Sequence, residues 1–176
     1  MKSHQSRSYT MKLKNAFIAS SLAVALGFGG AALLTATSTY AYDETSTSAI
    51  NVDEHRVNLK GYDTVSYFQG APAEGNSRFA VEHDGALYYF ANAENMKTFQ
   101  ANPTAYVPQY GGYCAMGAAL GKKLDVDPSQ YKVVDGKLYL NVNADVFQKW
   151  AEDVPGNIAK ADSNWPLIKD LAPNAL

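Results

Sequence analysis

The residue with the most distinctive chemistry is a single cysteine in a glycine-rich segment. Cys114 is the only cysteine among the 176 residues, and it follows Gly111, Gly112 and a tyrosine. If the two glycines open a helix, the thiol lies in its first turn, where unpaired amides and the helix dipole favour the thiolate. A thiolate is a nucleophile and a soft ligand for copper or zinc. The alternative is a buried, inert cysteine that packs as a small apolar side chain.

Tyrosines and one aspartate are the candidate contacts of a small ligand. Tyr110 and Tyr113 flank the glycine pair, and a second dense segment, residues 61–68, has the sequence GYDTVSYF. The tyrosines either pack in the core or line a pocket with their hydroxyl groups towards a ligand. An aspartate at position 63 can bind a ligand or cap backbone amides. We therefore expect a small-ligand site formed by Tyr110, Tyr113, Asp63 and Tyr67.

Histidines give little support for catalysis. Only His55 and His83 follow residue 41, and His83 directly precedes an Asp-Gly pair, which predicts an exposed position in a turn. His55 stands among charged residues and is either a surface residue or a second metal ligand beside Cys114. The chain contains no GxSxG, Walker A or HExxH motif and no paired cysteines of the zinc-binding type.

The first 41 residues have the pattern of a secretory signal peptide. Lys12 and Lys14 supply a positive end, residues 16–34 are almost all apolar or small, and residues 39–41 offer a small-x-small cleavage site. We expect cleavage after Ala41 and a periplasmic or secreted domain. The alternative is an uncleaved leader, which would be the only contact with a membrane.

The rest of the chain has the length of one domain. Residues 42–51 are rich in Ser, Thr and acidic side chains, which predicts a flexible lead-in, and residues 52–176 form the expected domain. All 17 acidic residues but only 11 of the 15 basic ones follow residue 41. This acidic balance argues against nucleic acid or anionic lipid as a partner. With one cysteine, no internal disulfide can form, so stability must come from packing.

The same order of elements is predicted twice. Residues 79–102 and residues 131–153 each read as two short strands joined by an Asp-Gly turn and followed by a helix. A short helix of small side chains is expected over residues 116–120. Residues 155–171 predict one or two further helices. The fold class is therefore α+β, with two hairpin-plus-helix units and added C-terminal helices.

The two hairpin segments match at an offset of 51 residues. With this offset Asn92 falls on Asn143, and both are candidates for the N-cap of the following helix. Phe99 falls on Trp150, and both belong to an apolar helix face that should pack on the hairpin. An internal duplication is one explanation, and chance similarity of two amphipathic pieces is the other.

Several of these segments resemble the YHS domain family, and most closely its exported members. The resemblance is carried by the GYDTVSYF sequence at 61–68, the YGGYCA sequence at 110–115 and DGKLYLN at 135–141. It extends from about Asn58 to Trp165. YHS domains occur in copper-transporting ATPases and in some hydroxylases, so the resemblance implies metal binding, with copper as a candidate.

The sequence departs from the metal-type YHS pattern at three positions. Such modules carry cysteines where this chain has Ser66, Ala91 and Asn95. Cys114 is then the only soft ligand left, with His55 as a candidate partner. One thiolate holds a metal well only where the fold gathers further ligands around it.

Three functions follow from the sequence. The first is an extracytoplasmic protein that binds a small ligand or a metal ion, copper or zinc, with Cys114 as the anchor. The second is a thiol redox enzyme that uses Cys114 alone. The third is a non-catalytic interaction module with core tyrosines and an inert cysteine.

Overall fold

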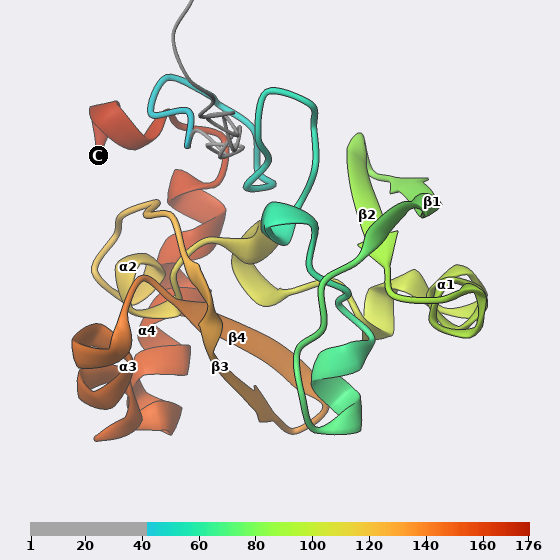
Figure 1. Cartoon of the computed structure of the whole chain (residues 1–176). Coiled ribbons are helices and arrows are strands. Elements are labelled where there is room, and N and C mark those ends of the chain that lie inside the picture. Colours follow the sequence, from blue (N-terminus) through green and yellow to red (C-terminus); the bar gives the residue numbers. More distant parts are fainter. Residues whose placement is uncertain (1–41) are drawn as a thin grey trace, which may run out of the picture. The chain divides into compact units, whose positions relative to one another are not determined.

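The computed structural model describes residues 42–176 (Figure 1), so the expected signal peptide lies outside the described residues. The described part contains two antiparallel two-stranded hairpins and four α-helices, which confirms the α+β class. No helix within residues 42–176 combines the length and the apolar character that crossing a bilayer requires.

The strands form two separate hairpins, β1 (Asn76–His83) with β2 (Ala86–Phe90) and β3 (Asp127–Val134) with β4 (Lys137–Asn141). Both turn on the expected Asp-Gly pairs, residues 84–85 and 135–136, where φ is positive at all four positions. Each hairpin also has one irregularity in its pairing, within residues 76–80 and within residues 127–131. These irregularities again lie 51 residues apart.

The four helices are α1 (Ala93–Ala101), α2 (Ala115–Ala119), α3 (Ala144–Ala151) and α4 (Val154–Ile168). Asn92 caps α1 and Asn143 caps α3, because their side-chain oxygens accept the N–H groups of Asn95 and Val146, each at 2.9 Å. Both predicted N-caps are confirmed. Short 3₁₀ turns complete the chain: η1 (Leu59–Gly61), η2 (Ser66–Gln69), η3 (Pro103–Ala105), η4 (Gln109–Gly112) and η5 (Pro173–Ala175).

The match at 51 residues extends upstream of the hairpins. Residues 59–61 have φ from 51° to 79°, and residues 110–112 have φ from 53° to 88°. Positive φ is uncommon outside glycine, so two such runs at the same offset are a specific likeness. Each run leads into a short helix, η2 or α2, which is followed by a left-handed glycine, Gly70 or Gly121. We call residues 59–101 the first unit and residues 110–151 the second unit. Internal duplication remains the hypothesis that would explain the likeness.

Three apolar clusters form the core. Phe99 packs with Tyr88 and Phe90 in the first unit, and Trp150 packs with Tyr139 in the second unit, where α2 and α4 also contribute. Phe99 and Trp150 therefore face their hairpins as expected. The third cluster joins the units, because side chains of the first unit meet side chains of the second: Leu59, Tyr67, Cys114, Val126, Leu138 and Leu140. In Figure 1, α1 lies beside the β1–β2 hairpin, and α3 and α4 lie on the side of β3–β4.

Candidate functional site

The thiol of Cys114 is buried. Its residue is 0% exposed, and its Sγ caps α2 by accepting the N–H of Gly117 at 3.3 Å. The thiol also lies 3.5 Å from Asn141 Oδ1, to which its S–H donates. Burial raises the pKa of the Cys114 thiol, although the amides around it act in the opposite direction. The structure therefore does not show the expected preference for the thiolate, because loss of water outweighs the amides at the helix start.

The carboxylate of Asp63 is fully occupied by groups of the protein. The residue is buried, and Oδ1 accepts the N–H groups of Val65 at 2.9 Å and Ser66 at 3.3 Å. Oδ2 accepts the N–H of Ala91 at 2.9 Å and the side-chain amide of Asn95 at 2.6 Å. Asp63 thus joins the start of the first unit to the connection between β2 and α1.

Asp63 and Cys114 hold equivalent places in the two units. The N–H of Asp63 donates to Ala73 O at 2.9 Å, and the N–H of Cys114 donates to Leu124 O at 3.0 Å. Each side chain then accepts the N–H three residues ahead, at 3.3 Å in both units. Asp63, which was predicted to bind a ligand, and Cys114, which was predicted to bind a metal, therefore occupy the same capping position in the two units.

The three candidate tyrosines direct their hydroxyl groups to the protein. Tyr67 donates to Pro128 O at 2.9 Å, and Tyr110 donates to Asp162 Oδ1 at 2.9 Å. Tyr113 donates to Ser48 O at 3.2 Å. Burial raises the pKa of all three, and that of Tyr113 to about 12. Tyr67 packs in the cluster of Cys114, whereas Tyr110 packs in the cluster of Trp150.

His55, the predicted second metal ligand beside Cys114, lies at the surface, whereas the Cys114 thiol is buried. The His55 side chain is 74% exposed, and its Nε2 lies 3.6 Å from the Glu54 carboxylate. Across residues 42–176, no group of three or more His, Cys, Asp or Glu side chains is arranged to hold a metal ion. Among the described residues, the Cys114 thiol is surrounded by the Asn141 side chain and by apolar side chains.

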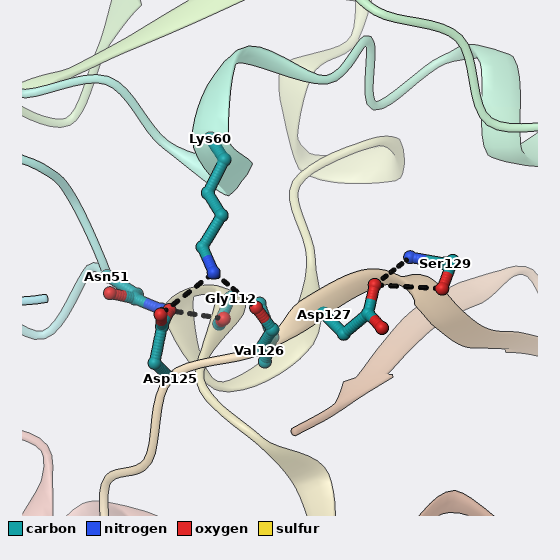
Figure 2. A network of polar contacts seen from close by, with 7 residues as sticks. All are labelled: Asn51, Lys60, Gly112, Asp125, Val126, Asp127 and Ser129. Atoms are coloured by element: carbon teal, nitrogen blue, oxygen red, sulfur yellow. Dashed lines mark hydrogen bonds and ion pairs between the residues drawn. The ribbon is translucent and has the colours of Figure 1, made fainter. Parts of the chain in front are cut away.

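The lead-in crosses the glycine loop of the second unit (Figure 2). The N–H of Asn51 donates to Gly111 O at 2.9 Å. Its side-chain amide donates to Gly112 O at 3.3 Å and to Asp125 Oδ1 at 3.0 Å, as Figure 2 shows. A Cβ on Gly111 would lie 1.9 Å from Ala49 O. Glycine at position 111 is therefore what lets the segment approach so closely.

A buried lysine fastens the same segment. Lys123 is 1% exposed, and its Nζ donates to three main-chain carbonyls: Ser48 O at 2.7 Å, Lys169 O at 3.0 Å and Leu171 O at 2.8 Å. The ammonium also lies 4.8 Å from the centre of the Tyr113 ring. Burial lowers the pKa of Lys123. Sequence reasoning gave Lys123 no role, since nothing around it in the chain indicates burial.

The equivalent surface of the first unit is open. A cleft of about 350 Å³ lies there, lined by Lys60, Gly61, Tyr62, Glu74, Gly75, Tyr89 and Pro128. Residues 60–62 correspond to residues 111–113 at the 51-residue offset, and Glu74 corresponds to Asp125. In the second unit the lead-in covers this surface, and in the first unit the surface is accessible. The volume of the cleft is within the range of small-molecule sites.

The chemistry of the cleft comes from four side chains. Lys60 Nζ lies 2.9 Å from Asp125 Oδ2 and donates to Val126 O at 2.7 Å, so its charge is already paired (Figure 2). Tyr62 and Tyr89 are half-buried, and neither hydroxyl has a hydrogen-bond partner within residues 42–176. Glu74 is exposed and forms no ion pair with any described residue. The cleft is therefore lined by two tyrosines whose hydroxyls have no partner among the described residues and by one carboxylate without an ion pair there.

A further cleft of about 350 Å³ lies beside the lead-in, with Tyr42, Asp43 and Asp53 among its lining residues. Its aspartates are engaged in their own turns: Asp43 Oδ1 accepts the N–H of Thr45 at 2.8 Å, and Asp53 Oδ1 accepts the N–H of His55 at 2.8 Å. Carboxylates held in this way stabilise local turns, so this cleft offers less to a ligand than the cleft of the first unit.

Three comparisons, with family models, with curated proteins and with solved structures, found no match to this chain. The site is therefore assigned on its geometry alone. Sequence reasoning missed Glu74 and Tyr89 as lining residues, and it treated Tyr62 only as part of a dense segment. The signal that could have found Tyr62 and Glu74 is the same offset continued upstream, which places Gly61-Tyr62 on Gly112-Tyr113 and Glu74 on Asp125.

Proposed function

We propose that the chain is an extracytoplasmic small-ligand-binding protein whose site is the cleft of the first unit. The observation that carries this proposal is the contrast between the units. Equivalent surfaces are covered by the lead-in around Gly111 and open around Gly61. The extracytoplasmic part of the proposal rests on the signal-peptide pattern of residues 1–41.

The proposal differs from the first sequence hypothesis in its anchor. Cys114 contributes through packing and a cap, because its thiol is buried and its raised pKa reduces the thiolate fraction. The same burial weighs against a thiol redox enzyme, whose nucleophile must reach its substrate. Copper or zinc at Cys114 would need further ligands beside Asn141 and the apolar side chains that surround the thiol. Membership of the YHS family stays a prediction from the motifs.

Protein-observed NMR tests the proposal. The purified protein is titrated with a panel of small cationic, anionic and neutral compounds, and backbone amide shifts are followed. We expect at least one compound class to shift the amides of residues 60–62, 74–75 and 89, which surround the cleft. The matching amides of residues 111–113 serve as the internal control, because the lead-in covers them. Shifts that fall elsewhere, or no response to any class, would contradict the proposal.

A further inference from the structure

We infer that the cleft of the first unit takes a small organic cation of the alkylammonium class. The inference rests on the proposed function and adds the charge and chemical type of the ligand. It is argued from the pairing of charges in the two units, from the side chains that line the cleft and from its volume.

In the second unit, the carboxylate at the position equivalent to Glu74 has both a hydrogen-bond donor and an ion-pair partner. Asp125, the equivalent of Glu74, accepts the side-chain amide of Asn51 at 3.0 Å and pairs with the Lys60 ammonium at 2.9 Å. Glu74 has neither kind of partner within residues 42–176. The first unit therefore has a carboxylate at the equivalent position, but no ammonium group of residues 42–176 pairs with it.

The charge of the cleft favours a cation. Lys60 is the one basic side chain in the lining, and its charge is neutralised by Asp125. Glu74 therefore leaves one negative charge in excess. The acidic balance of residues 42–176, with 17 acidic against 11 basic residues, attracts cations to the surface as a whole.

The remaining lining selects an organic cation over a metal ion. Tyr62 and Tyr89 line the cleft, and aromatic rings attract an ammonium group electrostatically, whether or not it carries N–H groups. Calcium requires six to eight oxygen ligands, and the lining contains one carboxylate. A volume of about 350 Å³ accommodates a compact ligand.

The first arm of the test compares choline with 3,3-dimethylbutan-1-ol, which has the same shape and no charge. Both are titrated into the purified full-length mature protein, and amide shifts around residues 60–62, 74–75 and 89 are measured. We expect choline to bind there at least about five-fold more tightly than the neutral compound, and to weaken as salt is added.

The second arm uses matched variants. Glu74→Gln removes the charge at nearly constant size and should weaken choline several-fold, whereas Glu152→Gln, the same change at the exposed residue that directly follows α3, should leave binding unchanged. Tyr62→Leu and Tyr89→Leu should each weaken choline about three- to thirty-fold, whereas the corresponding Phe variants keep the ring and most of the affinity. Urea midpoints of all variants identify any that have lost the fold.

The outcomes separate the two proposals. Equal affinity for choline and its neutral analogue, or full affinity in folded Glu74→Gln, overturns the cation while the cleft remains a binding site. Binding of only anionic or neutral compounds at the cleft likewise overturns the cation and keeps the cleft as a binding site. Failure of every compound class to shift the cleft amides overturns the proposed function itself.

Discussion

At the scale of single residues, an aspartate and a cysteine perform one structural task. Asp63 and Cys114 are both buried and both accept the N–H three residues ahead, that of Ser66 or Gly117. The carboxylate reaches four donors because it has two oxygens, whereas a single sulfur atom accepts less. The cysteine that seemed the most reactive group of the chain is thus explained by the needs of a short helix.

Substitution of Cys114 tests this role. Cys114→Ala leaves the buried N–H of Gly117 without its acceptor, so the free energy of unfolding should fall by about 1–3 kcal/mol. Cys114→Ser keeps an acceptor and should lose less. Urea unfolding followed by circular dichroism measures both. A serine variant no more stable than the alanine variant would show that the cap contributes nothing.

Sequence reasoning found the important positions but not their partners. It singled out Asp63 and Cys114 from their local surroundings, with a backbone cap as the alternative for the aspartate and an inert, packed side chain as the alternative for the cysteine. The contacts that decide the matter come from distant residues, Asn95 for the aspartate and Asn141 for the thiol. Local patterns carry no information about such pairs, so these contacts could not be predicted from the sequence.

At the scale of elements, local chemistry predicted most of what the structure contains. The Asp-Gly turns and the Asn caps act within four residues, so the hairpins and α1 and α3 were predicted correctly. The strands begin earlier than expected, at Asn76 and Asp127, because each hairpin continues past an irregularity in its pairing. The left-handed run at 59–61 was not predicted, since leucine and lysine give no signal for positive φ.

The close contact between the lead-in and Gly111 can be tested through its effect on stability. Gly111→Ala should destabilise the protein more than Gly121→Ala. Both glycines have positive φ, 62° and 74°, so both variants carry the backbone cost of about 1 kcal/mol or more. A Cβ at position 111 would also strike Ala49 O, whereas one at position 121 meets nothing within 4 Å. Equal urea midpoints for the two variants would show that the lead-in does not lie against the loop at Gly111.

At the scale of the whole molecule, buried tyrosines make stability depend on alkaline pH. Burial raises the pKa of six of them: Tyr42, Tyr67, Tyr88, Tyr110, Tyr113 and Tyr139. An unfolded tyrosine releases its proton near pH 10. Stability is therefore complete below about pH 10 and is lost as pH rises through the interval up to the folded value, about 12 for Tyr113.

Unfolding in urea at several pH values between about 8 and 11 tests this expectation. The midpoint should hold up to about pH 8, fall slightly near pH 9, where an unfolded cysteine ionises and the buried Cys114 thiol does not, and fall more steeply above about pH 10. Lys123 acts in the opposite direction, because its lowered pKa makes the folded state gain as pH rises towards 10.5, but it is one group against six. A midpoint that stays constant through pH 11 would contradict the burial of the tyrosine hydroxyls.

The Lys123 ammonium joins segments from opposite ends of the described chain. Lys123→Met keeps most of the apolar volume but leaves the carbonyls of Lys169 and Leu171 without a side-chain donor, and that of Ser48 with the Tyr113 hydroxyl as its donor. Stability should therefore fall by about 1–3 kcal/mol or more. Lys122→Met, at the exposed neighbouring position, is the matched control and should change stability by about 0.5 kcal/mol or less. Thermal unfolding compares the pair, and similar melting temperatures would show that the buried ammonium is dispensable.

The meeting of these segments makes the domain a natural candidate for circular permutation. Besides the Lys123 contacts, the N–H of Asn174 donates to Glu44 O at 3.0 Å, so the two ends of the described chain lie side by side. A short linker could join them, and new ends could be opened at the Asp84-Gly85 turn, where both residues are exposed and a Cβ on Gly85 would meet nothing within 4 Å. Such a permutant would keep the cleft, the covered loop and the shared core in one rearranged chain.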